Sequence, residues 1–451
     1  MKKSAKLLLP LLLAGIVVCL ALILANRWYS RDRHPDAAYL SLLNEAYVAV
    51  VTSYVEKPDA KKLVQSMVDG MLAALDPHSA YLPPEPYHEM EVQMSGSFGG
   101  IGIELGMKDS RLTVIAPIED TPAFRAGIQA NDHIYKIDGV PTQGMSIAAA
   151  VKRMRGEQGT PVTLTILRGD SSLPRNFRLI RAIIKVKSLK SRLLEPGYGL
   201  VRITQFQEHT GDEFSQALQE LHTASGGKLK GLVIDLRYNP GGLLESSVQV
   251  ANNFIGDDAG KTLIVSIRGR TPDATRNFNA TLGPKEAHYP IVVLINGGSA
   301  SASEIVAGAL QDHKRAIVMG KQSFGKGSVQ SIYPLRDNGA LKLTTARYYT
   351  PSGRSIQAKG ITPDIEVGTV WPVAAKNAAK GTEIREKDLE NRLEAGDEEK
   401  DRNEKDVKEK VTAPHGMGST ADAAKDYQLN RALELLRSLD LVRQKGVSAL
   451  R

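Results

Sequence analysis

The sequence is poor in cysteine. Of its 451 residues only Cys19 is a cysteine, and it lies in an apolar run near the amino terminus. The chain beyond that run has no thiol and can form no disulfide, which makes it compatible with an oxidising compartment. The sequence also shows no internal repeat, no P-loop and no cluster of metal-ligating residues. We therefore expect neither a metal nor a nucleotide cofactor.

The basic residues do not form a cluster in the sequence. Lys and Arg number 58 against 50 Asp and Glu, a formal net charge of +8, but the basic residues are scattered among acidic ones. Aromatic residues make up only 5% of the chain and are not interleaved with a basic cluster. A nucleic-acid partner is therefore not expected.

What the sequence does contain is clearest at 290–330. An apolar run at 291–295 ends at an Asn-Gly-Gly sequence, which predicts a buried strand followed by a tight turn. Apolar residues at helical spacing come next, so Ser301 is expected where a helix begins. A second apolar run at 316–319 predicts another strand, and Lys326 follows it between two glycines.

A serine at a helix start and a lysine on a glycine-rich loop are the two parts of a nucleophile pair. The Ser301 hydroxyl can attack a carbonyl once a base removes its proton, and a neutral lysine amine can be that base. Since the ordinary pKa of lysine is about 10.4, burial or a nearby cation must lower the pKa of Lys326. Free N–H groups at the helix start, that of Ala302 above all, would stabilise the oxyanion.

Local sequence leaves simpler interpretations open. Residues 301–304 also fit a capping box in which Ser301 only closes the helix, and the Gly-Lys-Gly sequence fits an exposed turn. Ser299, Ser303 and Lys321 are chemically admissible as nucleophile or base as well.

Three motifs resemble those of the carboxyl-terminal processing peptidases, also called tail-specific proteases. They are the stretch 290–330, GLVIDLRYNPGGLL at 231–244 and RYYTPSGRSIQAKGITPDI at 347–365. The similarity extends from about Tyr47 to Val367. The resemblance implies a serine endopeptidase.

The resemblance also assigns roles to single residues. It implies that Ser301 is the nucleophile, that Lys326 is the general base and that Gln330 orients the lysine. The oxyanion donors that it implies are the N–H groups of Gly242 and Ala302.

The one long hydrophobic run is at the amino terminus. Lys2, Lys3 and Lys6 precede nineteen uncharged residues, 7–25. As a helix they would span roughly 28 Å, against about 30 Å for the hydrocarbon core of a bilayer. We favour an uncleaved signal-anchor over a cleaved signal peptide. The remainder is then expected on the periplasmic or extracytoplasmic side of the cell envelope, anchored to the inner membrane.

Residues 36–92 are predicted to be helical, with apolar residues on two helix faces. The segment 76–79, Asp-Pro-His-Ser, breaks the helix. It favours a turn whose Asp76 and Ser79 cap backbone groups over a catalytic role for His78. The resemblance implies that this region contributes to dimer contacts. The two faces consist of Leu40, Leu43, Ala46, Tyr47, Val50 and Val51, and of Leu63, Met67, Met71 and Leu75.

Residues 93–186 resemble a PDZ domain. A glycine-rich loop at 98–103 feeds a strand, and its N–H groups would hold a peptide carboxylate. Residues 148–154 would form the helix beside the groove. Apolar side chains in the loop favour a ligand with a nonpolar C-terminal residue, and a hairpin without a ligand is the alternative. The loop residues expected to bind this ligand are Gly100, Ile101, Gly102 and Ile103.

Residues 187–370 are expected to form an α/β catalytic domain. An apolar strand at 232–236 is followed by an Asn-Pro-Gly-Gly turn and a helix, and the same order recurs at 291–311. Two such units indicate parallel strands with the site at their carboxyl ends. The resemblance implies a ββα-repeat core like that of the crotonases and the Clp peptidase, in a multi-domain chain with an inserted PDZ domain.

The composition changes after Trp371. Residues 371–426 are rich in Ala, Lys, Glu and Asp, which predicts a charged, solvated linker. A helical apolar face returns at 427–439, so a helix is expected within 427–451. It could dock on the core or mediate oligomerisation. With residues 1–35 as the signal segment, these ranges complete the predicted domain organisation.

The predicted function is a serine endopeptidase of the bacterial cell envelope that binds protein C-termini and cleaves or degrades the tail. Substrates with nonpolar C-termini are the expected partners, together with an adaptor protein and further copies of the chain in a dimer or larger oligomer. A catalytically inactive PDZ-bearing envelope adaptor is the main alternative. A Ser/His/Asp hydrolase would need a Gly-x-Ser-x-Gly elbow or a Gly-Asp-Ser-Gly run, and the sequence has neither.

Overall fold

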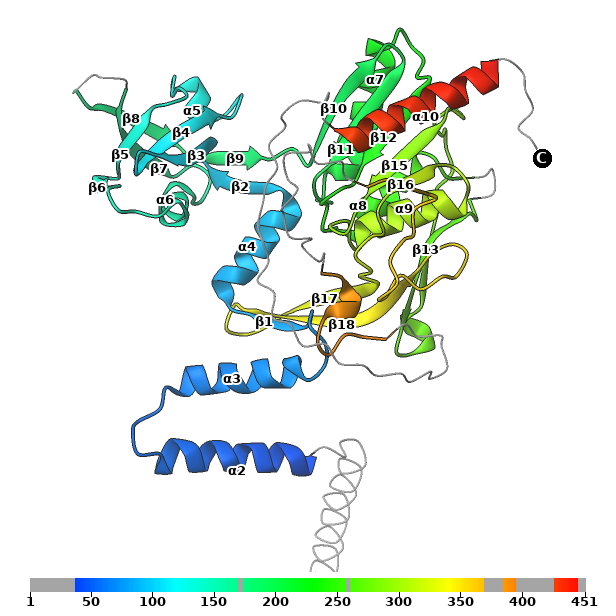
Figure 1. Cartoon of the computed structure of the whole chain (residues 1–451). Helices are drawn as coiled ribbons and strands as arrows, with labels where there is room; N and C mark the ends of the chain where they lie inside the picture. Colours follow the sequence, from blue (N-terminus) through cyan, green and yellow to red (C-terminus); the bar gives the residue numbers. More distant parts are fainter. Residues whose placement is uncertain (1–36, 169–172, 257–259, 369–383, 395–425, 445–451) are drawn as a thin grey trace, which may run out of the picture. The chain divides into compact units, whose positions relative to one another are not determined.

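The computed structural model describes residues 37–168, 173–256, 260–368, 384–394 and 426–444 (Figure 1). The chain divides into two compact units, Met1–Met71 and Leu72–Arg451. Among the described residues, no helix is both long and apolar enough to cross a membrane. The membrane span expected at 7–25 lies outside the described residues.

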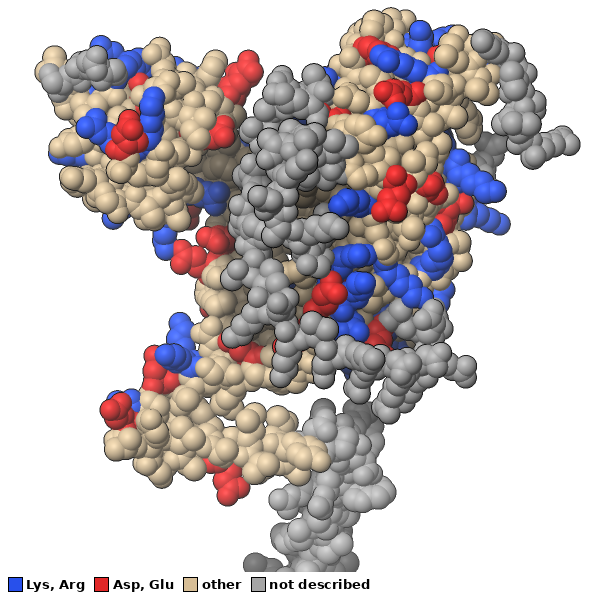
Figure 2. Space-filling model, viewed as in Figure 1, with Lys and Arg blue, Asp and Glu red and all other residues tan. Residues whose placement is uncertain are grey.

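Two helices begin in the first unit, α2 (Ala37–Ser53) and α3 (Ala60–Ala73), which confirms the helical prediction for these segments. The predicted apolar residues of α2 are nevertheless exposed, Leu40 to 64% and Leu43 to 48%. Figure 2 shows mostly uncharged surface over both helices. An apolar helix surface of this kind is typical of an interaction site.

The predicted break at 76–79 is present, but the helical prediction for 36–92 is wrong for the strand that follows it. A turn at 76–79 leads into the short strand β1 (Ala80–Leu82), and α4 (Pro84–Ser95) follows. Strand β1 pairs antiparallel with β18 (Ala340–Tyr349), about 260 residues later in the chain. Prolines at 77, 83 and 84 disfavour a continuous helix, and such a distant strand partner leaves no local sequence pattern.

The region from Ser97 to Lys185 has its own sheet and core. The strand order is β3-β4-β5-β7-β8, so β3 (Ile103–Lys108) is an edge strand, and α6 (Ile147–Met154) lies where the groove helix was predicted. Strand β2 (Ser97–Gly100) pairs with β9 (Ala182–Lys185). The other elements are β4 (Arg111–Pro117), α5 (Pro122–Arg125), β5 (His133–Ile137), β6 (Val140–Pro141), β7 (Pro161–Leu167) and β8 (Arg175–Ile180).

The remaining core is built on a six-stranded sheet of order β10-β11-β12-β15-β16-β19. Strand β10 is antiparallel to β11, and all other neighbours are parallel, as predicted for the two repeated units. The strands are β10 (Leu189–Glu195), β11 (Tyr198–Ile203), β12 (Gly231–Asp235), β15 (Ile291–Ile295), β16 (Ile317–Gly320) and β19 (Ile365–Glu366).

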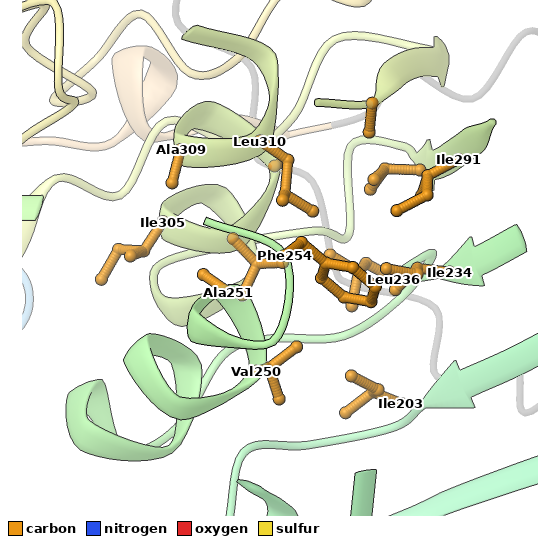
Figure 3. Packing of buried hydrophobic residues seen from close by; sticks show 14 of the residues in the cluster. Ile203, Ile234, Leu236, Val250, Ala251, Phe254, Ile291, Ile305, Ala309 and Leu310 are labelled. Atoms are coloured by element: carbon orange, nitrogen blue, oxygen red, sulfur yellow. The ribbon is translucent and has the colours of Figure 1, made fainter. Parts of the chain in front are cut away.

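Helices cover both faces of this sheet. Alternate strand residues such as Ile234 and Val293 pack in the cluster under α7 (Thr210–Ala224), α8 (Leu244–Asn252) and α9 (Ala302–Asp312) (Figure 3). Their neighbours in sequence, such as Val233 and Val292, belong to a second cluster with Leu429 and Leu436 of α10 (Tyr427–Gln444). Because successive side chains of a strand point to opposite faces, burial of both faces explains the continuous apolar runs.

Helix α10 resolves the alternatives left open for the C-terminal helix, since it docks on the sheet. Its apolar face packs as described above, and Asp426 just before it binds Arg237, with Oδ2 2.6 Å from Nη2. Arg237 also binds Asp235 at the end of β12. The pairing lies close in sequence to the Asn-Pro-Gly-Gly turn, so α10 is linked to one of the predicted site loops.

A second sheet contains β1, β17 (Ser328–Pro334), β18, β13 (Leu263–Gly269) and β14 (Arg276–Asn279), with β18 pairing to β1, β13 and β17. The loop that carries Lys326 leads directly into β17. Short 3₁₀ turns occur at Pro272–Ala274 and Glu386–Asp388.

The prediction of a solvated linker through 371–426 is wrong for Glu386, although most of the described residues 384–394 are exposed. Glu386 is fully buried, at 0% exposure, and its N–H donates to the carbonyl of Phe324 over 3.2 Å. Arg385 donates to the amide oxygen of Gln322. Low aromatic content and high charge predict solvation on average, but they do not exclude one buried carboxylate with several partners.

Candidate active site

Two turns at the carboxyl ends of β12 and β15 meet each other. The carbonyl of Asn239 accepts hydrogen bonds from the N–H of Ala300 and the hydroxyl of Ser303, each over 3.0 Å. A Cβ at Gly241 would lie only 2.8 Å from the Cβ of Ser301. Glycine is therefore required for this close approach, and the Asn-Pro-Gly-Gly turn lies directly beside Ser301.

Ser301 has a strained backbone at the start of α9. Its φ of 55° and ψ of −115° are unusual for a residue with a side chain, and it is the residue just before Ala302, where the helix begins. The expected helix start is confirmed. The sequence lacks the Gly-x-Ser-x-Gly motif, yet the chain makes a sharp strand-to-helix turn of the kind that exposes a nucleophile.

The other two serines of the run have structural partners. Ser299 donates to the carbonyl of Leu236 over 2.8 Å and accepts from the N–H of Asn296. Ser303 donates to Asn239. Both are fully buried, whereas Ser301 keeps 8% exposure and its hydroxyl interacts with Tyr348. Burial raises the pKa of Tyr348 to about 12, so this neighbour stays neutral.

Glu304 connects the Ser301 turn with the Lys326 loop. One carboxylate oxygen, Oε2, accepts from the N–H of Ser301 over 2.7 Å and from the N–H of Lys326 over 3.0 Å. The other oxygen accepts from Ser323 and from Gly325. Because this fully buried carboxylate accepts from four donors, it fixes the position of the Ser301 turn relative to the Lys326 loop.

Sequence reasoning treated Glu304 only as part of a possible capping box and missed its link to the lysine loop. The hydrogen bond from the Ser301 N–H to Glu304 is the one that a capping box predicts. The other three donors to Glu304 come from residues 323–326. Burial raises the pKa of Glu304 to about 7, against the lowering effect of these hydrogen bonds. The four donors favour the ionised form.

Lys326 lies in surroundings that favour a neutral amine. Burial lowers its pKa and the positive charge of Lys342 adds to this effect, while Glu386, Glu304 and Asp76 oppose it. Among the described residues, no hydrogen bond joins the Lys326 amine to the Ser301 hydroxyl. The structure thus joins these two residues through their backbones and Glu304.

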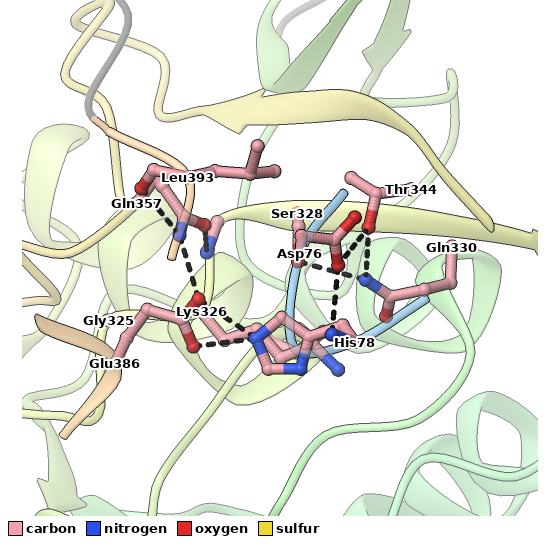
Figure 4. A network of polar contacts seen from close by, with 12 residues as sticks. Asp76, His78, Gly325, Lys326, Ser328, Gln330, Thr344, Gln357, Glu386 and Leu393 are labelled. Atoms are coloured by element: carbon pink, nitrogen blue, oxygen red, sulfur yellow. Dashed lines mark hydrogen bonds and ion pairs between the residues drawn. The ribbon is translucent and has the colours of Figure 1, made fainter. Parts of the chain in front are cut away.

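Gln330 is bound elsewhere than at the lysine amine. Its side-chain amide donates to the hydroxyl of Ser328 over 2.9 Å and to that of Thr344 over 3.3 Å (Figure 4). Thr344 in turn donates to Asp76 over 3.1 Å. Gln330 therefore belongs to the polar network around Lys326 without a hydrogen bond to it in the described part of the chain.

The segment 76–79 forms the turn that was predicted. Asp76 accepts hydrogen bonds from the N–H groups of His78 and Ser79 and from the Ser79 hydroxyl. Burial raises its pKa, but these bonds outweigh that effect and the net shift is downward. The same turn places Asp76 among the charges that act on Lys326 and brings His78 onto Glu386, which the sequence did not indicate.

Gly242 and Ala302 present backbone N–H groups near Ser301. Gly242 has a φ of 138°, and a Cβ there would lie 2.0 Å from the carbonyl oxygen of Phe206. The N–H of Ala302 is in the first turn of α9, where helix donors lack intrahelical acceptors. Within the described residues neither N–H has an acceptor. Both are available to a ligand oxygen.

The predicted carboxylate-binding loop lies between β2 and β3. Gly100 ends β2 and Ile103 begins β3, so only Ile101 and Gly102 are outside a strand. Ile101 is 3% exposed and packs in the core, which leaves its backbone rather than its side chain to face a ligand. The N–H groups of Ile101 and Gly102 have no acceptor in the part of the chain that the structure describes.

Metal-ligating residues do not gather in the described ranges, where no group of three or more His, Cys, Asp or Glu could hold an ion. No histidine of these ranges forms a hydrogen bond with Ser301.

Comparisons with known proteins agree with the resemblance. The model of peptidase family S41 matches residues 197–367, and that of the PDZ domain matches residues 99–177. A carboxy-terminal-processing protease of Bartonella bacilliformis is 44% identical over 430 residues, 94% of each chain. A probable CtpA-like serine protease of Staphylococcus aureus is 37% identical over 361 residues, 80% of this chain and 71% of that protein. The solved photosystem II D1 C-terminal processing protease is 30% identical with a TM-score of 0.41, covering 73% of this chain and 92% of that one.

Proposed function

Because this chain belongs to the carboxy-terminal-processing serine proteases of peptidase family S41, we propose that it cleaves protein tails with Ser301 as nucleophile and Lys326 as general base. The observation that carries the proposal is the Glu304 carboxylate, one oxygen of which binds the N–H groups of both residues. The lowered pKa of Lys326 supports a neutral amine at the pH of the reaction.

The proposed reaction begins when the Lys326 amine takes the proton of the Ser301 hydroxyl. The Ser301 oxygen bonds to the scissile carbonyl carbon, and the oxyanion accepts hydrogen bonds from the N–H groups of Gly242 and Ala302. The Lys326 ammonium then protonates the leaving amine as the peptide bond breaks. Lys326 next takes a proton from water, whose oxygen bonds to the acyl carbon. The Ser301–acyl bond then breaks as Lys326 returns the proton to the Ser301 oxygen. The amine must reach the hydroxyl in the substrate complex, where catalytic contacts tighten.

We propose that the PDZ domain captures the free C-terminus of a nonpolar tail. Strand β3 is an edge strand beside α6, so a peptide can add to it as a further strand. The unpaired N–H groups of Ile101 and Gly102 would receive the terminal carboxylate.

Amidation of the peptide's C-terminus is therefore expected to weaken binding by about tenfold or more, because a charge-assisted hydrogen bond contributes roughly 1.5–3 kcal/mol. The measurement is fluorescence polarisation of a labelled peptide ending in valine, bound to full-length Ser301→Ala protein. Acetylating the peptide's N-terminus instead is the matched control and should change nothing. Equal affinity for the acid and the amide would contradict carboxylate capture.

We propose that the enzyme works in the cell envelope, anchored to the inner membrane by residues 7–25. The lysines before this apolar run and the lack of cysteine beyond it support export. The full chain should then fractionate with membranes and resist carbonate extraction, and protease added to spheroplasts should digest the part after residue 35. A protein recovered from the soluble cytoplasm would contradict this proposal.

We further propose that the chain forms a homo-oligomer through α2 and α3, whose exposed apolar residues support such an interface. Sedimentation of protein lacking residues 1–35 should give more than the monomer mass, and replacing Leu40 and Leu43 with glutamate should return it to the monomer. An adaptor protein remains an additional expected partner, and affinity capture with Ser301→Ala protein would identify it.

A further inference from the structure

The segment 384–394 brings a fully buried carboxylate into the site, that of Glu386. A buried carboxylate must be paired or hydrogen-bonded, because burial without partners is costly. Its partners are His78, whose Nε2 lies 2.7 Å and 2.8 Å from the two oxygens, and Gln357, whose Nε2 donates over 2.8 Å. Two distant parts of the sequence thus meet at one side chain.

The same contacts bind the backbone on both sides of Lys326. Two residues before the lysine, the carbonyl of Phe324 accepts from the N–H of Glu386 over 3.2 Å. One residue after it, the N–H of Gly327 donates to the side-chain oxygen of Gln357 over 3.0 Å. Because Gln357 is held by Glu386, one residue controls both flanks of the loop.

Charged groups from several elements act on the Lys326 amine. Figure 4 shows two of them, Asp76 and Glu386, near Lys326. Glu386, Glu304 on α9 and Asp76 before β1 are negative, Lys342 on β18 is positive, and His78 contacts Glu386. Burial and Lys342 lower the pKa of Lys326, and the three carboxylates oppose this. Of these carboxylates, only that of Glu386 comes from beyond residue 370.

We propose that Glu386 is a positioning residue that holds the Lys326 loop from both sides and, with Lys342 as the opposing charge, sets the pH at which the amine becomes a base. This inference rests on the proposed function, in which Lys326 is the general base. Glu386 does not touch the substrate and acts through the lysine. A purely structural carboxylate would hold the loop but leave the pH dependence of the reaction unchanged.

The test is the pH profile of kcat/KM for the full chain with a quenched fluorescent peptide ending in valine. Glu386→Gln keeps the shape and removes the negative charge, so the amine loses its proton more readily. The acidic limb of the profile should move down by on the order of one pH unit. Lys342→Gln removes the positive charge, and the limb should move to higher pH.

The matched control is Glu286→Gln. Glu286 also contacts a histidine, with Oε2 2.8 Å from Nε2 of His222, but it is outside the set of charges that act on Lys326. Its profile should match that of the parent protein. Glu304, whose pKa is raised to about 7 by burial, is unchanged in all three variants, so its titration is common to all the profiles.

The proposal would be overturned if the acidic limb of the kcat/KM profile lies at the same pH in Glu386→Gln, in Lys342→Gln and in the parent protein. If Glu386→Gln loses its fold, the partly exposed Lys342 still provides the test, and an unmoved limb in Lys342→Gln has the same consequence. Failure of the proposed function would look different, since Lys326→Met protein would then remain active and no limb could be assigned to the lysine.

Discussion

Replacing Ser301 with alanine is expected to lower kcat/KM for peptide cleavage by at least about 10⁴-fold, because in the proposed reaction the hydroxyl forms the covalent bond to the substrate. The thermal unfolding midpoint should change little. Alanine keeps the Cβ, and the Ser301 N–H still donates to Glu304. Peptide hydrolysis and a melting curve of the same preparation check both statements.

Ser247→Ala is a matched control for this experiment. Ser247 is a fully buried serine of α8 whose hydroxyl donates to the carbonyl of Leu244 and to no residue of either site turn. We expect it to keep activity and to lose some stability, since a hydrogen bond of this kind contributes roughly 0.5–1.5 kcal/mol. Undiminished hydrolysis by Ser301→Ala would disprove its role. A parent protein without any peptidase activity would instead favour the inactive adaptor.

Replacing Lys326 with methionine is expected to lower kcat/KM by roughly 10³-fold or more, because a general base of this type contributes both to attack and to release. Methionine has similar length and leaves the N–H of residue 326 to donate to Glu304. In the parent protein, kcat/KM should rise with pH as the amine loses its proton. Because the pKa of Lys326 is lowered, this rise should occur below the ordinary lysine value of about 10.4.

Lys321→Met separates the two lysines that the sequence allowed as bases. Lys321 follows β16 and its N–H donates to the carbonyl of Ile295, which methionine preserves. We expect this variant to keep most of the activity and the pH profile of the parent. Loss of activity in Lys321→Met together with full activity in Lys326→Met would reassign the base.

The parts of the site that could be predicted from the sequence are those built by local pattern. The apolar strands at 231–235 and 291–295 are buried on both faces, so they appear as continuous apolar runs. Each ends in a glycine-rich turn and a helix, and parallel strands bring such turns to one edge of the sheet. The helix start at Ser301 follows from this order, and the structure confirms it.

The parts that could not be predicted depend on side-chain contacts between distant segments. The contact of Glu304 with residues 323–326 crosses from a helix to a loop, and that of His78 with Glu386 joins residues about 300 positions apart. Neither leaves a periodic signal in the sequence. Glu386 lies in a segment whose average composition predicts solvation, and only its burial reveals its partners.

Glu386 is synthesised later than the two proposed catalytic residues, and this order affects when the enzyme can become active. A polypeptide emerges from the ribosome with its amino end first, so Ser301 and Lys326 exist before Gln357 and Glu386 have been made. If Glu386 acts as proposed, a nascent chain has its nucleophile and its base but not the groups that fix the base. The lysine would therefore become a well-positioned base only after the segment that carries Glu386 has been synthesised and has folded onto its loop.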